Sequence, residues 1–183
     1  MVGLLIGTAV LSGCSEKQQA NESLPTSSAA EKTQSRPELG PEDFRVPDEA
    51  RVQDPAGAQA FVRYYFELIN HTSATLEPDA LRQLSEDCDD CARIADNAER
   101  SAQAGHRYDG GQITITEMAP ALVRDGTADM AIRLNQSTLV VRDASGNPVA
   151  EGSSEEYVGL PGSVSLAWKP ALDSWVMTYM TFG

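Results

Sequence analysis

The stretch AFVRYYFELIN, residues 60–70, decides the fold class of this chain. Its apolar side chains recur every three or four residues, which places them on one face of a helix. With one residue that precedes the stretch, this face consists of Ala58, Phe61, Tyr64, Tyr65, Leu68 and Ile69. Asp54 and Pro55 are typical of a helix start, because aspartate accepts hydrogen bonds from free N–H groups and proline fits the first helical position. We therefore predict an amphipathic helix over residues 55–72.

Two shorter helices are predicted after this one. A turn over residues 72–78 leads to a short helix from Pro78 to Leu84. A third helix is predicted from Asp87, an N-cap residue followed by acidic residues in the first turn, to Gly105, a typical helix stop. The segment before residue 106 is therefore predicted to be mainly helical.

The rest of the chain changes to the two-residue period of β-strands. Alternate positions are apolar in TADMAIRLN, residues 127–135, and the Asp-Gly pair just before them is a typical hairpin turn. Two more strands flank a turn over residues 169–174 in SLAWKPALDSWVMTYM, residues 165–180. We predict about four to six antiparallel strands in all. Helices followed by consecutive strands indicate an α+β domain.

The charge of the chain argues against two kinds of partner. The 183 residues have a formal net charge of −13, and residues 51–183 carry −9 of it. Nucleic-acid binding needs clustered lysine and arginine against the phosphates, so no nucleic-acid partner is expected. The same acidity opposes adsorption to anionic lipid, so a membrane contact has to come from another source.

An uncharged segment begins the chain and ends at a cysteine. Its apolar core, residues 2–11, is far shorter than the roughly 20 residues that span a bilayer as a helix, and it is typical of a secretory signal. The sequence LSGC, residues 11–14, resembles the lipobox of bacterial lipoproteins. This resemblance implies cleavage before Cys14 and attachment of a diacylglyceryl group, with fatty acyl chains such as palmitate, to the Cys14 thiol.

The expected location and domain limits follow from this resemblance. Residues 1–13 are predicted to be a lipoprotein signal peptide, and the acylated Cys14 to anchor the chain at the extracytoplasmic face of the cell membrane. An ordinary signal peptide with a chance cysteine, or a buried N-terminal helix, are the alternatives. Residues 14–50 are predicted to be a disordered linker because they are rich in Ser, Glu, Gln, Pro and Ala, and residues 51–183 to be one domain.

The order of the elements also resembles a known fold. A long helix with paired aromatics leads to a short helix in DALRQLS, residues 79–85, and a strand meander ends in SLAWKPALDSWVMTYM. This arrangement resembles the nuclear transport factor 2-like, or cystatin-like, cone, and it implies helices packed into the concave face of a curved antiparallel sheet. With the lipobox, the linker and a C-x-x-C motif, the whole chain is similar to a family of actinobacterial lipoproteins whose domain has no assigned function.

Two cysteines remain once Cys14 is assigned to the lipid. Cys88 and Cys91 form the C-x-x-C motif, and an even pair in an oxidising compartment predicts a disulfide. A redox-active dithiol is one alternative, although the aspartates around the pair would raise the thiol pKa values. Zinc binding is the other alternative, and it lacks a second pair of ligands at a suitable spacing.

Few residues are candidates for a pocket inside the predicted cone. Asp79 is a candidate base, and Tyr64 or Tyr65 a candidate proton donor, as the resemblance to cone-fold enzymes implies. The alternative is that both tyrosines belong to the core. Trp168 and Trp175 flank the last turn and are candidates for the mouth of the pocket, with aromatic packing between strands as the alternative.

The predicted function is that of a membrane-anchored, extracytoplasmic binding or accessory domain without catalytic activity. The alternative is an enzyme or a small-ligand-binding protein that uses the cone pocket. Acidic residues at 86–90 and 143–151 lack the order of a calcium loop, so neither a metal nor a cofactor is predicted. The expected partners are the membrane, through the lipid, and an envelope protein or a second copy of the chain.

Overall fold

The structure is a computed structural model that describes residues 36–183. The predicted signal peptide, Cys14 and the first part of the predicted linker lie outside the described residues. A 3-10 helix, η1 (Asp48–Arg51), precedes three α-helices, α1 (Pro55–Thr75), α2 (Asp79–Gln83) and α3 (Asp89–Gln103). The described part of the chain then forms eight strands: β1 (Arg107–Gly110), β2 (Ile113–Met118), β3 (Leu122–Arg124), β4 (Thr127–Gln136), β5 (Leu139–Arg142), β6 (Pro148–Ser154), β7 (Tyr157–Lys169) and β8 (Ser174–Phe182).

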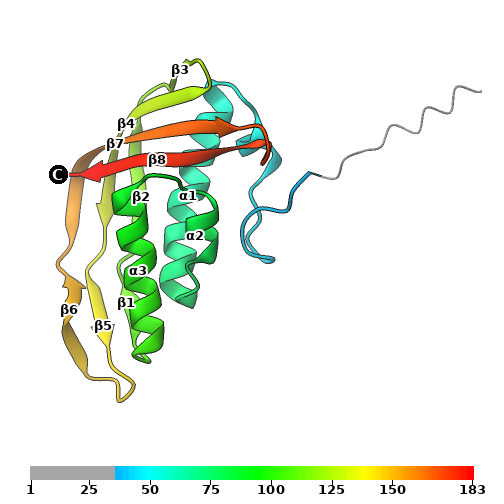
Figure 1. Ribbon diagram of the computed structural model, residues 1–183. Helices are drawn as coiled ribbons and strands as arrows, with labels where there is room; N and C mark the ends of the chain where they lie inside the picture. The colour runs from blue at the N-terminus through cyan, green and yellow to red at the C-terminus, as the bar shows by residue number, and fades with distance from the viewer. Residues whose placement is uncertain (1–35) are drawn as a thin grey trace, which may run out of the picture. The chain divides into compact units, whose positions relative to one another are not determined.

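The eight strands form two antiparallel sheets. The larger sheet has the order β2-β4-β7-β8, with β3 also paired to β4, and the smaller sheet has the order β1-β5-β6. Figure 1 shows the helices α1, α2 and α3 gathered on one face of the curved larger sheet. The predicted α+β class, with N-terminal helices packed on a curved antiparallel sheet, is confirmed. The strand count is higher than the predicted four to six, because β1 and β3 are short additional strands.

Helix α1 lies at the centre of the core. Its predicted N-cap is present, since the Asp54 carboxylate accepts a hydrogen bond from the Gly57 N–H at 2.7 Å. The helix continues to Thr75, three residues past the predicted end, and stops where Leu76 adopts a left-handed backbone with φ of +58°. More than one helical stripe is buried, because both the sheet and other parts of the chain pack on α1, while Arg63 and Glu67 stay exposed. The large buried side chains are Phe61, Val62, Tyr64, Tyr65, Phe66, Leu68 and Ile69.

Strand β4 supplies the sheet side of this core. Its alternate residues are buried and the residues between them are exposed, as the two-residue period predicts. The buried set is Ala128, Met130, Ile132 and Leu134. In the neighbouring strand β7, Leu166 lies opposite Ala128 and Val164 lies opposite Met130, and both are buried. The two strands therefore present one continuous apolar face to the helices.

The segment of residues 36–51, here called the strap, belongs to the folded domain. Leu39, Val46 and Ala50 are buried in the same core as α1. The Val46 N–H donates to the Leu39 carbonyl at 3.0 Å, which closes residues 39–46 into a compact loop. The predicted domain start at Arg51 is therefore too late by at least 15 residues. Polar composition indicated a linker, but three apolar side chains of the strap find partners elsewhere in the fold.

The acidic segment of residues 143–151 begins in the turn between β5 and β6. The Asp143 carboxylate accepts hydrogen bonds from the main-chain N–H groups of Ser145 and Asn147, both at 2.8 Å, and from the Asn147 side chain at 3.1 Å. These bonds, led by those from Asn147, hold the pKa of Asp143 below its ordinary value. The carboxylate thus stabilises the hairpin turn, as the sequence predicted.

Candidate binding groove

The interior of the cone is filled by the aromatic side chains that were candidates for its pocket. The Tyr64 hydroxyl donates to the main-chain oxygen of Phe44 at 2.8 Å. Tyr65 is fully buried, and its hydroxyl lies 3.5 Å from the main-chain oxygen of Leu81. Burial raises the pKa of Tyr65 to about 12 and also raises the pKa of Tyr64. Both phenols are therefore neutral core groups with main-chain partners, which is the alternative that the sequence left open.

The two tryptophans pack together across the last hairpin. Trp168 and Trp175 are directly opposed on β7 and β8, and their rings meet edge to face at 5.4 Å between centroids. Trp175 is fully buried and its indole N–H donates to the Val52 carbonyl at 2.8 Å. This arrangement is cross-strand aromatic packing, the alternative to a pocket mouth.

Asp79 has a different environment from the four aromatic candidates. It is the first residue of α2, and its side chain is exposed on the outside of the domain. The structure therefore does not bring the five predicted pocket residues together at one site. Asp79, the candidate base, is exposed, whereas the hydroxyls of the candidate proton donors Tyr64 and Tyr65 have main-chain oxygens as partners.

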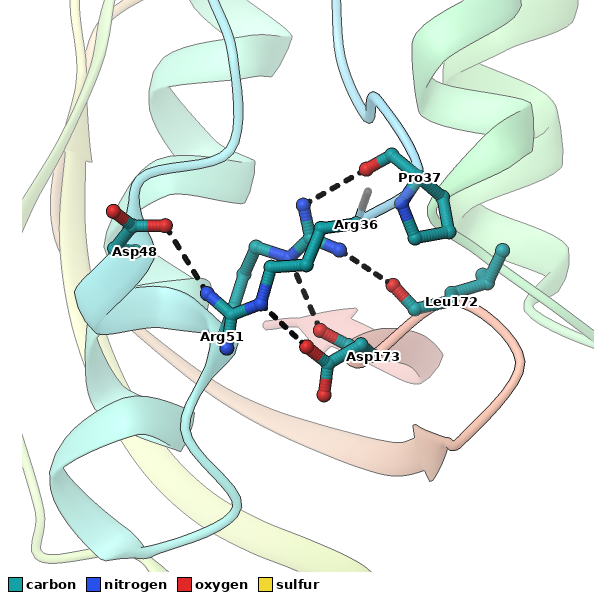
Figure 2. A network of polar contacts seen from close by, with 6 residues as sticks. All are labelled: Arg36, Pro37, Asp48, Arg51, Leu172 and Asp173. Carbon is teal, nitrogen blue, oxygen red and sulfur yellow. Dashed lines mark hydrogen bonds and ion pairs between the residues drawn. The ribbon is translucent and has the colours of Figure 1, made fainter. Parts of the chain in front are cut away.

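A polar network fixes the strap to the last hairpin (Figure 2). Arg51 is buried, and its guanidinium donates to three main-chain oxygens: Pro37 at 2.9 Å, Leu172 at 2.7 Å and Asp173 at 3.0 Å. Burial lowers the pKa of Arg51, and the nearby Arg36 adds to this effect. Each of the three guanidinium nitrogens thus has a carbonyl partner, and these bonds join two segments that are far apart in sequence.

Exposed ion pairs surround this buried arginine. Arg36 binds the Asp173 carboxylate at 2.6 Å and the Asp48 carboxylate at 3.1 Å. Figure 2 shows the two arginine side chains lying next to each other between the strap and the turn before β8. Like charges at this distance repel, so the two aspartates and the three carbonyls are needed to hold both cations in place.

The loop of the strap is anchored to the helices by stacking and by one side-chain amide. The Phe44 ring stacks on Tyr64 and on His71, with centroid distances of 5.2 Å in both cases. The Gly40 N–H donates to the Gln83 side-chain oxygen at 3.1 Å. These contacts hold the strap loop against α1 and α2. An opening remains between the strap loop and the connection from α1 to α2.

That opening is a groove with a volume of about 540 Å³. Here called the strap groove, it lies between the strap loop on one side and the α1–α2 connection with α2 on the other. Its lining residues are Gly40, Pro41, Leu76, Glu77, Pro78, Asp79, Ala80 and Gln83. The size falls within the range of about 300–1,000 Å³ that is usual for ligand sites. Asp79 is the one predicted site residue that lines it.

The acidic side chains at the rim of the strap groove are exposed. Glu77 and Asp79 lie on the α1–α2 side, and neither forms an ion pair with another residue of the range 36–183. On the strap side, Glu42 is exposed, and the Asp43 carboxylate lies 3.7 Å from the His71 ring. The groove therefore combines an apolar lining with two carboxylates on its α1–α2 side, and two more acidic residues follow Pro41 in the strap.

A second, smaller cavity of about 190 Å³ lies between α1 and β1 with the connection from β1 to β2. The Asn70 side chain at its wall accepts from the Ile113 N–H and donates to the Ile113 carbonyl, both at 2.8 Å. The Tyr108 hydroxyl lies 2.8 Å from the Ser101 hydroxyl. Because these polar groups are already bonded within the protein, the cavity is a weaker candidate site than the strap groove.

The C-x-x-C motif forms the predicted disulfide. Cys88 and Cys91 are joined and both are buried, and the Cys88 sulfur also accepts the Cys91 N–H at the start of α3. The connection just before this bond pairs with the edge of β8, since the Met177 N–H donates to the Leu84 carbonyl at 2.9 Å. The disulfide thus fastens the α2–α3 connection beside the sheet edge. No group of three or more metal-ligating side chains occurs within residues 36–183.

The comparisons with known proteins define the family of the chain. A model of DUF6318, a family of unknown function, matches residues 45–181, and the chain therefore belongs to this family. A search of curated proteins found no match. None of the helices in the described range is long and apolar enough to cross a membrane.

Three solved structures illustrate the fold relationship. The intermembrane space region of the chloroplast protein ARC6 is 15% identical with a TM-score of 0.52, over 70% of this chain and 95% of that chain. A nuclear transport factor 2-like superfamily protein from Salmonella enterica serovar Typhimurium is 14% identical with a TM-score of 0.39, over 62% and 80%. The protein Aln2 from a Streptomyces species is 11% identical with a TM-score of 0.43, over 69% and 89%. At 15% identity, the ARC6 region shows a likeness of fold alone.

Several residues of the groove and of the strap network were not predicted. Gly40, Pro41, Glu77 and Gln83 carry no motif, and Arg51 was placed at the domain boundary. A usable signal was present in LGPEDFRV, residues 39–46, where three large apolar residues interrupt an otherwise polar segment. Such residues inside a supposed linker indicate a segment that packs on the domain.

Proposed function

We propose that this protein is an extracytoplasmic lipoprotein, anchored through acylated Cys14, whose domain binds a partner at the strap groove and has no catalytic activity. One observation carries the binding part of this proposal. The cone interior, where enzymes of similar folds were expected to work, is occupied by Tyr64, Tyr65 and Trp175, while the larger open cavity lies outside it.

The chemistry of the groove supports binding rather than catalysis. A general base and its proton donor have to approach within hydrogen-bond distance of one substrate. In the described chain, the ionisable side chains that line the groove are the exposed Glu77 and Asp79, whereas the Tyr64 and Tyr65 hydroxyls face main-chain oxygens. An apolar lining with charged edges instead has the general character of a recognition surface.

The anchor part of the proposal is supported by the LSGC sequence at residues 11–14 and by the uncharged apolar segment before it. Two acyl chains provide stable anchoring where one chain is marginal, so a diacylated cysteine would retain an acidic domain at the membrane without electrostatic help. The acidic character of the chain makes such an anchor necessary for membrane residence.

Palmitate labelling in the bacterial host tests the anchor. The natural chain should incorporate labelled palmitate and sediment with membranes, and the Cys14→Ser variant should lose both properties. A double variant, Cys88→Ser with Cys91→Ser, is the matched control, because it also removes thiols but should keep the label. A Cys14→Ser chain that still takes up palmitate and sediments with membranes would contradict the anchor.

A further inference from the structure

We infer that the strap groove receives a lysine or arginine side chain, with a neighbouring apolar side chain, from an extended segment of a partner protein. This inference rests on the proposed binding function and names the chemistry of its ligand. Two independent features of the groove carry it: an apolar lining and carboxylates that lack a cation within the described chain.

The apolar lining calls for a ligand with apolar atoms. Pro41 faces the groove from the strap, and Leu76, Pro78 and Ala80 face it from the α1–α2 side. Burial of apolar surface contributes about 25 cal/mol per Å², so a ligand that covers this lining gains affinity from it. A small hydrophilic ion would leave the lining uncovered and would gain nothing there.

The rim carboxylates call for positive charge. Glu77 and Asp79 line the groove, and Glu42 and Asp43 lie on the strap loop beside it. The arginines near the groove are already engaged, since Arg45 pairs with Glu38 at 3.0 Å and Arg82 pairs with Asp96 and Glu99 on α3. The His71 ring is stacked on Phe44 and lies 3.7 Å from the Asp43 carboxylate. Among residues 36–183, the rim therefore has an excess of negative charge.

A lysine or arginine within a polypeptide meets both requirements at once. Its aliphatic stem covers apolar surface while its charged end stays near the carboxylates and water. An exposed ion pair alone is worth only about 0–1 kcal/mol, so a free amine that contacts the rim would bind weakly. The groove volume of about 540 Å³ leaves room for a side chain next to the cationic one.

The walls of the groove are held in place before any ligand binds. The Gly40 N–H is bonded to Gln83 across the groove, and the Leu76 N–H donates to the Thr72 carbonyl at 2.7 Å at the end of α1. Preformed walls reduce the ordering cost of binding. The strap side is further fixed by Arg51, whose three carbonyl partners lie on both the strap and the last hairpin.

Fluorescence anisotropy with two labelled heptapeptides tests the ligand class. The full-length chain in uncharged detergent is titrated against a peptide of alternating leucine and lysine and against its counterpart with glutamate in place of lysine. The lysine peptide should bind with a Kd below about 1 mM at low salt, at least about tenfold more tightly than the glutamate peptide. Failure of the lysine peptide to bind overturns the inference.

Variants localise the binding. The double variant Glu77→Gln with Asp79→Asn should weaken binding of the lysine peptide at least about tenfold, and Ala80→Phe should do the same by filling the groove. Glu155→Gln with Glu156→Gln is the matched control, because it removes two exposed carboxylates from the connection between β6 and β7. An equal loss in this control would mean that diffuse acidity attracts the peptide, and the groove would be rejected as the site.

Competition distinguishes a protein segment from a free amine. Spermidine at the concentration of the peptide should not displace it, because spermidine lacks a bulky apolar group for the lining. Displacement by spermidine at that concentration would overturn the peptide assignment. If the chain incorporates palmitate but does not bind the lysine peptide, this inference is rejected and the proposed anchor is supported. If the chain binds the peptide but does not incorporate palmitate, the anchor is rejected and this inference is supported.

Discussion

The Nε atom of Arg51 donates a hydrogen bond to the main-chain oxygen of Asp173 at 3.0 Å, across 122 residues of sequence. This contact joins the end of the strap to the turn between the last two strands. The same guanidinium also binds Leu172 in that turn and Pro37 in the strap. The strap, which forms one side of the candidate groove, is thus held by the last hairpin of the chain.

Replacement of Arg51 should destabilise the domain strongly. Arg51→Ala removes three charge-assisted hydrogen bonds and leaves three carbonyls with lost partners, so we expect a loss of about 3 kcal/mol or more in the free energy of unfolding. Arg51→Lys should recover only part of this, because an ammonium group cannot reproduce the planar fork. Urea denaturation of each variant measures the effect.

Arg36→Ala is the comparison for this prediction. The side chains of its two ion pairs are all at least 41% exposed to solvent. Loss of these ion pairs should therefore cost about 1 kcal/mol or less in the free energy of unfolding. A loss as large as that of Arg51→Ala would show that exposed ion pairs, rather than the buried guanidinium, hold the strap.

Gly57→Ala should destabilise the protein although it lies in a helix. Helix propensity alone predicts a gain of about 1 kcal/mol from alanine. A Cβ atom at Gly57, however, would lie 2.1 Å from the Val52 carbonyl oxygen, which also accepts the Trp175 indole N–H. The required shift should cost about 1–3 kcal/mol, as overpacking usually does.

Thermal unfolding checks the sign of this effect. Ala74→Gly, at an exposed position near the end of the same helix, is the control that reports propensity without a contact. It should lower stability by about 1 kcal/mol. A higher melting temperature for Gly57→Ala would contradict the close contact with Val52.

Loss of the disulfide should weaken the domain without unfolding it. The bond between Cys88 and Cys91 closes a very small loop, so on the chain-entropy model it contributes about 2 kcal/mol. For a domain of this size, that corresponds to a fall in Tm of about 4–8 °C. Differential scanning calorimetry of the double alanine variant measures it, and mass spectrometry that finds two free thiols in the natural chain would reject the bond itself.

Stability should fall as the pH rises through the alkaline range. Burial raises the pKa of Tyr65 to about 12 in the folded state, above its ordinary value of 10 in the unfolded chain, and acts in the same direction on Tyr64. The folded state therefore keeps its protons more tightly, so this stability is complete below pH 10 and is lost as the pH rises toward 12. Each tyrosine should contribute a slope of about 1.4 kcal/mol per pH unit in that window.

Urea denaturation at several alkaline pH values tests this slope. Tyr65→Phe should remove about one tyrosine's share, because it removes the buried hydroxyl whose pKa is raised. Tyr179→Phe, which removes an exposed hydroxyl, is the control and should leave the slope unchanged. An unaltered slope in the Tyr65→Phe variant would mean that other groups govern the alkaline transition.

Local patterns predicted most of the secondary structure because they record burial by a neighbouring face. The alternation in β4 placed Ala128, Met130, Ile132 and Leu134 on one buried face, as found. The capping pair before α1 also predicted its first residue. The end of α1 was misplaced because the chain turns at Leu76, where no glycine marks the left-handed conformation.

The candidate groove was only partly accessible to such patterns. Asp79 was singled out for its charge, but it was assigned to the cone with Tyr64 and Tyr65, which lie inside the core. Its actual neighbours across the groove, Gly40 and Pro41, belong to a segment about 40 residues earlier. Periodicity contains no information on which distant segment meets a given helix.

The sequence by itself determined the α+β class, the helix around AFVRYYFELIN, the alternating strands and the cysteine pair, because each depends on neighbours within a few residues. Only the tertiary structure decided that the strap is part of the domain, that the aromatics fill the cone, and that the open groove lies outside it. Burial of Leu39 and Val46, like the bonds of Arg51, depends on segments up to 122 residues away, and those segments meet only when the whole chain has folded.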